Sequence, residues 1–319
     1  MILKETTYNK KYEKTFFALG TINTIVVYGS SCEDALNSAC RRILEIDYRM
    51  SAFKNDSDVM QINHYAGLEA QKINIDTFNL LKRALDFSRT SGGSFDITIR
   101  PLTELWGFGS KQNYVPERKM IEKILPLVNY KDVLLDDKKC TVFLKNKGQA
   151  IDLGGIAKGY AADEVKRVLL QYKIENALIN LGGNIITMGH NPTGASWRIG
   201  IQNPLSVRGQ YIGRVSVTNK TVVTSGSNEQ FFIKEGKRYH HIIDPRTGYP
   251  SKNELLSVTI LCECSTDADA VTTALFVQDI NKSISLLKSI NAEAIFILKN
   301  KDILVTEGLL DNFERRYHQ

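Results

Sequence analysis

Segments typical of β-strands follow one another in runs along the chain, and only a few helical segments separate them. Apolar and β-branched residues concentrate at 22–27, 133–135, 141–144, 177–181, 197–201, 212–217, 257–261, 294–298 and 303–305, which predicts strands there. Helical periodicity is present at 36–50, 78–85, 161–169 and 284–290, the spacing of a helix with one apolar face. The last two strand segments flank Asn300, Lys301 and Asp302, which is typical of a hairpin. This order favours an α+β fold with largely antiparallel sheets flanked by helices over a doubly wound fold.

Length and composition set the broad class. The chain has 319 residues, enough for one large core or two smaller ones, and 43% of them are hydrophobic and 24% charged, as in ordinary globular proteins. The net charge of +6 is spread along the chain, without the basic block or basic-aromatic stripe expected of a nucleic-acid-binding protein. We expect a single domain over residues 1–319, or two intertwined subdomains with the site between them.

The N-terminus and the cysteines bear on location. Residues 1–6 lack the apolar run of a signal peptide, and no stretch is long and apolar enough to span a membrane. Five cysteines are an odd number without CxxC spacing, which predicts neither a zinc site nor a disulfide framework. We therefore expect a cytoplasmic protein with free thiols; if a leader was removed, the location is extracytoplasmic.

Asp269 and Thr273 lie four residues apart in a helix-favouring stretch. This spacing places both side chains on one helix face. Hard oxygen donors suit Mg²⁺, which takes one or two protein groups and completes its shell with phosphates and water. The alternative is a pair of ordinary helix residues, the more common case for this spacing alone.

Residues 151–160 read as a strand, a glycine turn and a helix. Gly154 and Gly155 allow close approach of a ligand to the backbone, and free amides at a helix start attract phosphate oxygens. Lys158 adds a positive charge in the first turn. The glycine spacing fits neither a dinucleotide fingerprint nor a P-loop. A tight turn capped by Asp152 is the alternative.

Two aromatic segments could pack against a planar ligand. In residues 91–98 a glycine turn leads into a short segment predicted to be extended, where Phe95 could pack on a ring and Asp96 could accept its hydrogen bonds. Phe53, just after the first long helix, offers a second ring. For both phenylalanines, a place in the core is the alternative.

Residues 239–250 combine two histidines with Asp-Pro and Thr-Gly turns. In an extended strand, His240 and His241 face opposite sides, so only one points into a given site. A histidine titrates near neutrality and is the commonest general base. The alternative is one surface and one core histidine. Residues 224–227 form a candidate substrate loop.

Taken together, these segments resemble the ApbE family, the FAD:protein FMN transferases. The matching pieces occur in the family's order across nearly the whole chain, at 19–21, 50–53, 56–58, 62–63, 92–98, 101–102, 106–109, 151–160, 181–184, 197–201, 224–226, 241–250 and 268–276. One such piece is a weak signal, whereas the ordered set is specific. Two departures are Leu19, where the family often has Met, and the absence of the lipoprotein leader that many members carry.

The resemblance implies one ApbE-type flavin transferase domain that binds FAD and Mg²⁺. It implies a flavin-side set of residues, a metal-side set and a catalytic histidine, His241. The flavin side maps to Leu19, Phe53, Ser94, Phe95, Asp96, Asp152, Lys158 and Ile242, and the metal side to Asp269, Thr273 and the backbone carbonyl of Gly155.

The implied reaction is Mg²⁺-dependent transfer of FMN from FAD to a threonine hydroxyl of an acceptor flavoprotein, with release of AMP. Two alternatives remain open from the sequence. The first is a Mg²⁺-dependent FAD pyrophosphatase that yields FMN and AMP, and the second is a non-catalytic FAD-binding protein.

Overall fold

An eight-stranded sheet forms the centre of the computed structural model, which describes residues 10–30, 32–108 and 114–316. Every pair of neighbouring strands is antiparallel, and the α+β prediction is confirmed. The strand order is β1 (Lys11–Ala18), β2 (Thr21–Tyr28), β6 (Asn176–Leu181), β7 (Asn184–Met188), β10 (Thr221–Gly226), β13 (Leu255–Cys262), β14 (Glu293–Leu298) and β15 (Ile303–Val305).

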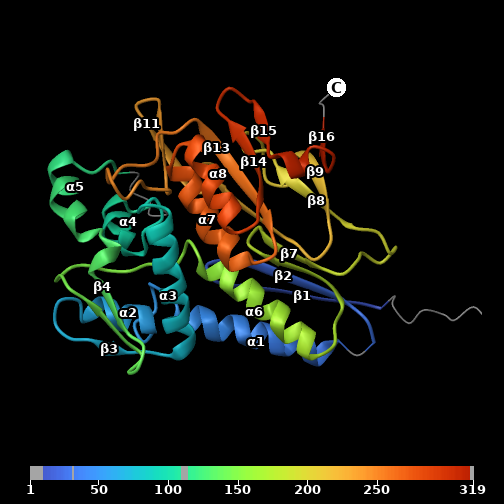
Figure 1. Cartoon of the computed structure of the whole chain (residues 1–319), viewed down its shortest axis with the longest axis horizontal. Coiled ribbons are helices and arrows are strands. Elements are labelled where there is room, and N and C mark those ends of the chain that lie inside the picture. The colour runs from blue at the N-terminus through green and yellow to red at the C-terminus, as the bar shows by residue number, and fades with distance from the viewer. Residues whose placement is uncertain (1–9, 31, 109–113, 317–319) are drawn as a thin grey trace, which may run out of the picture.

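Helices cover one face of this sheet (Figure 1). The helices α1 (Glu33–Arg49), α6 (Ala157–Gln171) and α7 (Ser265–Val277) pack side by side, and α3 (Ile75–Thr90) and α8 (Ile280–Ser289) lie against α7. Nearly all of α7 is buried, because it is enclosed by the sheet and by other helices. No helix among the described residues is long and apolar enough to cross a membrane.

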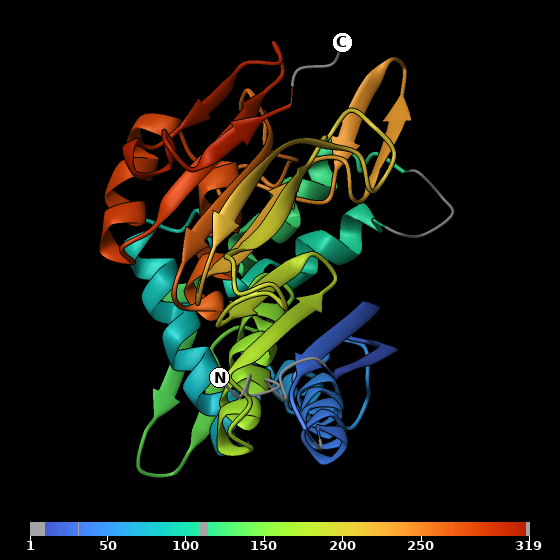
Figure 2. The same cartoon turned by 90° about the vertical axis from the view of Figure 1, so that its right-hand side faces the viewer.

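A second, three-stranded sheet packs on the opposite face, as Figure 2 shows from the side. Its order is β16 (Phe313–Arg315), β9 (Tyr211–Val217) and β8 (Trp197–Gln202). Trp197 and Val215 meet Val222, Leu261 and Ile295 of the central sheet in one apolar cluster.

A smaller aromatic cluster lies beside the main core. Here α4 (Arg100–Trp106) and α5 (Arg118–Ile124) support a separate hairpin made of β11 (Phe231–Lys234) and β12 (Lys237–His240). The Trp106 indole donates a 2.8 Å hydrogen bond to the Gly248 carbonyl. The remaining elements are α2 (Asp58–His64), a sheet of β3 (Gln71–Lys72), β5 (Thr141–Leu144) and β4 (Val133–Asp136), and 3-10 turns at Ile97–Ile99, Leu125–Leu127, Tyr130–Asp132 and Glu307–Leu309.

Three local predictions were wrong. Residues 224–226 of the candidate substrate loop belong to β10, where they pair with β13 in the central sheet. Residues 151–153 form no strand, because both backbone groups of Ile151 bond to the Asn63 side chain and the Asp152 amide donates to the Ile97 carbonyl. The segment after Gly93 is a 3-10 turn rather than extended, because the Asp96 carboxylate accepts hydrogen bonds from the Thr98 amide and hydroxyl. In the last two places side chains compete with strand pairing for the backbone.

Candidate functional site

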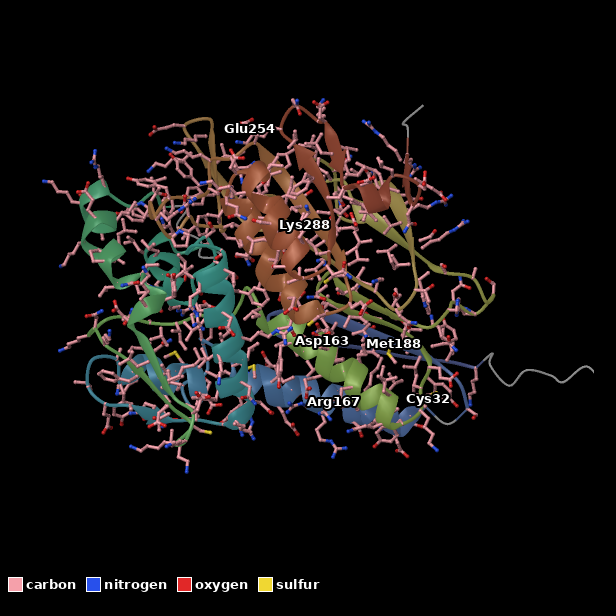
Figure 3. All side chains as sticks on the ribbon, viewed as in Figure 1. Cys32, Asp163, Arg167, Met188, Glu254 and Lys288 are labelled. Carbon is pink, nitrogen blue, oxygen red and sulfur yellow. The ribbon has the colours of Figure 1, made fainter. Side chains whose placement is uncertain are left out.

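The crossing of α6 and α7 positions the predicted metal-side residues. Asp163 on α6 accepts hydrogen bonds from the amides of Ser265 (3.0 Å) and Thr266 (2.8 Å), which caps the start of α7. Figure 3 shows Asp163 at this end of α7. One turn earlier, Gly159 lets the helices approach so closely that a Cβ there would lie 2.2 Å from the Ser265 carbonyl oxygen. The contact brings Asp269 against the beginning of α6.

Asp269 alters the hydrogen bonding of that helix start. The side chain is only 4% exposed, and its Oδ2 accepts a 2.9 Å hydrogen bond from the Gly159 amide. That amide would otherwise bond to the carbonyl of Gly155, four residues earlier. Within the described ranges, no backbone amide donates to the Gly155 carbonyl. The carboxylate therefore frees a backbone oxygen in its own neighbourhood.

Thr273 lies one turn further along α7, and its hydroxyl donates to the Asp269 carbonyl at 3.3 Å. A Cβ on Gly155 would lie 3.4 Å from the Thr273 oxygen and 3.1 Å from the Phe95 ring. The predicted metal-side residues Gly155, Asp269 and Thr273 are thus brought together. One carboxylate and two neutral oxygens fit Mg²⁺, which binds few protein groups. The described residues hold no group of three or more His, Cys, Asp or Glu side chains that could bind a metal ion.

Lys158 belongs to this cluster as well as to the glycine turn. Its Nζ donates to the Gly154 carbonyl at 3.1 Å and lies 3.7 Å from Asp269 Oδ1. The Asp152 carboxylate accepts a 2.7 Å hydrogen bond from the Gly154 amide, so the capping role considered for it is present. Lys158 therefore brings positive charge to the mouth of the turn, beside the Asp269 carboxylate.

Asp152 also connects the turn to the exposed aromatic ring of Phe53. Arg100 Nη1 donates a 3.3 Å hydrogen bond to Asp152 Oδ2, and the guanidinium carbon of Arg100 is 4.4 Å from the centre of the Phe53 ring. The Phe53 residue is 79% exposed. Phe53 is therefore a surface platform held by a cation–π contact. Arg100 was not predicted; the only signal is its place just after the glycine segment, before Pro101.

The other flavin-side residues are mostly buried. Ser94, Phe95, Asp96 and Ile242 belong to the interior. Burial raises the pKa of Asp96, although hydrogen bonds from Thr98 and Tyr130 oppose this. Phe95 fulfils the core role considered for it and also touches the glycine turn.

Leu19 lies elsewhere, at the tip of the β1–β2 hairpin. It adopts a left-handed conformation (φ +54°), and its amide donates to Asp47 Oδ1 at 3.0 Å. The Gly182 turn lies beside this tip, since a Cβ on Gly182 would be 2.5 Å from Thr21. Leu19 packs against the main core, and among the described residues no hydrogen bond joins it to Gly155, Asp269 or Thr273.

The two histidines separate into one buried residue and one partly exposed residue, which lies just after the end of β12. His240 is buried, its Nε2 lies 3.1 Å from the Ser251 carbonyl oxygen, and burial lowers its pKa to about 4. His241 is partly exposed, and its Nδ1 lies 3.3 Å from the Gln230 carbonyl oxygen. If Nδ1 carries the proton and donates it to that carbonyl, Nε2 is a free acceptor.

Burial also lowers the pKa of His241; the Gln230 hydrogen bond opposes this, and the charge of Lys158 adds to it. Glu229, which was not predicted, lies in the same electrostatic environment. Burial raises its pKa, whereas the charges of Lys158 and Arg208 lower it and Asp269 raises it. The charge of Lys158, which lies beside Asp269, therefore lowers the pKa of both His241 and Glu229. The structure also has a hollow of about 550 Å³ that contains none of these residues and is lined by Arg41, Leu44, Glu45, Tyr48, Arg49, Asp56 and Asp58.

Replacing Gly159 with alanine should destabilise the protein by about 1–3 kcal/mol, because its Cβ would clash with the Ser265 backbone and with Asp269 Cβ. Urea unfolding followed by circular dichroism measures the change. Leu170→Ala on the exposed side of α6 is the control and should be nearly neutral. Equal stability of the two variants would mean that the helices are less closely packed than described.

Comparison with known proteins gives a consistent result. A family model described as "ApbE family" matches residues 19–296. The chain is 37% identical to a FAD:protein FMN transferase of Klebsiella pneumoniae, covering 93% of this chain and 92% of that one, and 32% identical to one of Treponema pallidum, covering 95% and 88%. Among the sequence segments that resemble this family, only residue 109, at the end of segment 106–109, lies outside the described residues.

Solved structures agree with the fold. The ApbE protein of Thermotoga maritima superposes with a TM-score of 0.88 at 36% identity, covering 96% of this chain and all of that one. The flavin transferase ApbE from Vibrio cholerae gives a TM-score of 0.85 at 25% identity, covering 95% and 99%. The similarity therefore extends over almost the entire length of the chain.

Proposed function

Because the chain belongs to the ApbE family, we propose that it transfers FMN from FAD to a threonine hydroxyl of an acceptor protein and releases AMP in a Mg²⁺-dependent reaction. The matched relatives are enzymes named FAD:protein FMN transferase. The observation that carries the proposal is the convergence of the Gly155 carbonyl, Asp269 and Thr273 beside Lys158, whose positive charge also acts on His241. This arrangement supports the proposal because it offers oxygen donors suited to Mg²⁺, a positive charge and a candidate base.

The metal would be held by Asp269 Oδ1, Thr273 Oγ1 and the Gly155 carbonyl oxygen. When bound, Mg²⁺ would neutralise the negative charge that develops on the phosphates during the reaction. The diphosphate of FAD would lie against the turn at Gly154 and Gly155, where the positive charge of Lys158 also attracts its oxygens. The exposed ring of Phe53 offers a platform for an aromatic part of the ligand.

His241 then performs the proton transfer. Its Nε2 accepts the proton of the threonine hydroxyl while the threonine oxygen forms a bond to the FMN-side phosphorus. The bond from this phosphorus to the bridging oxygen breaks, and AMP leaves with that oxygen. The product is FMN joined to threonine by a phosphoester.

The direct test is to incubate the protein with FAD, Mg²⁺ and an acceptor peptide, and to search by mass spectrometry for an FMN-sized gain on threonine. Release of FMN and AMP without peptide modification would instead support the pyrophosphatase alternative. FAD that stays bound and unchanged would support a non-catalytic binder.

The cytoplasmic location stays a prediction. It rests on the sequence of residues 1–6, which lie outside the described residues.

The lowered pKa of His241 makes a prediction about pH. A base is active only when neutral, and a pKa below 6.5 keeps His241 neutral to lower pH than a free imidazole. We expect kcat/KM for transfer to fall on acidification with a midpoint below 6.5. An NMR titration of the imidazole resonances, assigned with His241→Gln, checks the group responsible. A midpoint above 6.5 would contradict the proposed environment.

A further inference from the structure

The β11–β12 hairpin grows directly out of the proposed catalytic loop. The chain enters β11 immediately after Gln230 and leaves β12 immediately before His241. At the base of the hairpin, the His241 amide donates a 3.0 Å hydrogen bond to the Gln230 carbonyl. Glu229 precedes this pair. Anything that binds along the hairpin therefore lies next to the candidate base.

One face of the hairpin is anchored to the rest of the protein. The Phe232 and Tyr239 rings stack at 5.4 Å, and the Trp106 ring is 5.6 Å from Tyr239. The Phe108 ring is 5.7 Å from Phe232. An isolated two-stranded hairpin is only marginally stable, so these contacts account for its position. The packing of Phe232 and Tyr239 therefore holds the hairpin in position without contacts from the side chains on its opposite face.

Apart from the buried His240 at the base, the opposite face is apolar and exposed and carries one basic side chain. Strand alternation places Phe231 and Ile233 on this side, where they are 40% and 61% exposed. Arg238 is the register partner of Ile233, and its guanidinium lies 4.2 Å from the centre of the Phe231 ring. We call Phe231, Ile233 and Arg238 the outer face. Both Figure 1 and Figure 2 show the hairpin projecting from the neighbouring elements.

Charge and backbone geometry indicate the kind of partner. Arg238 is the basic residue of the outer face, whereas strand alternation places Lys234 and Lys237 on the side of Phe232 and Tyr239. With one acidic side chain, Glu235, residues 231–240 have a net charge of +2. Within the described residues, β11 and β12 pair only with each other. Their outer edges therefore have backbone groups with which an extended peptide can pair.

We propose that the outer face docks the acceptor polypeptide, as an extended, acidic segment with apolar side chains close to its acceptor threonine. This inference rests on the proposed transfer function and adds the surface that selects the acceptor. Phe231 is the register partner of His240, the residue before His241. At about 3.3 Å per residue, the acceptor side chains that contact Phe231 and Ile233 would lie roughly two to four positions from the threonine.

The β8–β9 turn supports this arrangement from another segment. Burial raises the pKa of Glu229, and the positive charge of Arg208, in this turn, opposes that shift. Glu229 directly precedes Gln230, the hydrogen-bond partner of His241 at the base of the hairpin. Its neighbour Val207 is exposed. A docked acidic segment would thus meet a second basic side chain near the catalytic loop.

The test uses two 15-residue peptides with one central threonine, leucines three positions on either side, and either four aspartates or four lysines. The double variant Phe231→Ser/Ile233→Ser should raise KM for the acidic peptide at least tenfold. Its kcat and FAD affinity, measured by flavin fluorescence, should stay within about twofold of wild type. Arg238→Glu should shift the preference towards the lysine peptide.

The matched control is Ile284→Ser/Leu304→Ser, two similarly exposed apolar residues on α8 and β15, which should leave both constants unchanged. An unchanged KM in the hairpin variant, an equal loss in the control, or wild-type preference for the lysine peptide would overturn the docking proposal. Wild type that binds FAD but modifies neither peptide would also overturn it. Wild type that neither binds nor cleaves FAD would contradict the proposed function itself.

Discussion

Replacing His241 with alanine is expected to lower kcat/KM for FMN transfer by about 10²–10⁴-fold, the usual contribution of a positioned general base. The reason is geometric: the Gln230 carbonyl faces Nδ1, which leaves Nε2 as the acceptor of the threonine proton. Initial rates of FMN incorporation into an acceptor peptide measure the loss. FAD affinity should change little, because no ligand-binding role is proposed for the imidazole.

The matched control is His190→Ala, since His190 is exposed and donates a hydrogen bond to Asn176 through its backbone amide, which the substitution retains. This variant should retain wild-type rates. Added imidazole should partly restore transfer in His241→Ala but have no effect on the control. Undiminished transfer in His241→Ala would remove the residue from the proton-transfer role.

Replacing Asp269 with asparagine is expected to weaken Mg²⁺ binding and to lower transfer at least roughly 100-fold at limiting Mg²⁺. A bound metal contributes several kcal/mol of charge stabilisation, and each 1.36 kcal/mol corresponds to a factor of ten in rate. The asparagine side-chain carbonyl can still accept the Gly159 hydrogen bond. The change therefore removes charge while preserving the helix contact.

Calorimetric titration with Mg²⁺ in the presence of FAD separates metal binding from catalysis. Glu263→Gln is the control, because Glu263 is exposed and pairs with Lys220 on the surface. It should bind Mg²⁺ with wild-type affinity. Normal affinity in Asp269→Asn would rule out Asp269 as a metal ligand, whatever its effect on rate.

Much of the fold was predictable because strand and helix patterns are local. The predicted hairpin near the C-terminus is β14–β15, with Ile295 opposite Val305, and the four predicted helices all exist with longer bounds. β1 was missed because it is an edge strand with mostly polar, partly exposed residues. β11 and β12 were missed because only one face of each is buried, in an aromatic cluster built from distant segments.

The candidate site was predictable where its residues share one element. Asp269 and Thr273 lie on one face of α7, as their spacing required. Arg100 and Glu229 were missed because nothing in their neighbouring residues shows what they approach. Arg100 connects Phe53 to Asp152, and Glu229 reaches the surroundings of Lys158 only in the folded chain.

The amino-acid sequence alone determined the α+β class, the helix that carries Asp269 and Thr273, the glycine turn before α6 and the division of the two histidines into one buried and one partly exposed residue. These features depend on side-chain periodicity and turn chemistry over a few residues. Only the tertiary structure decided that the Gly159 amide donates its hydrogen bond to the Asp269 carboxylate and not to the Gly155 carbonyl. That hydrogen bond joins residues 110 positions apart. It depends on α6 and α7 packing so closely that a Cβ at position 159 would not fit.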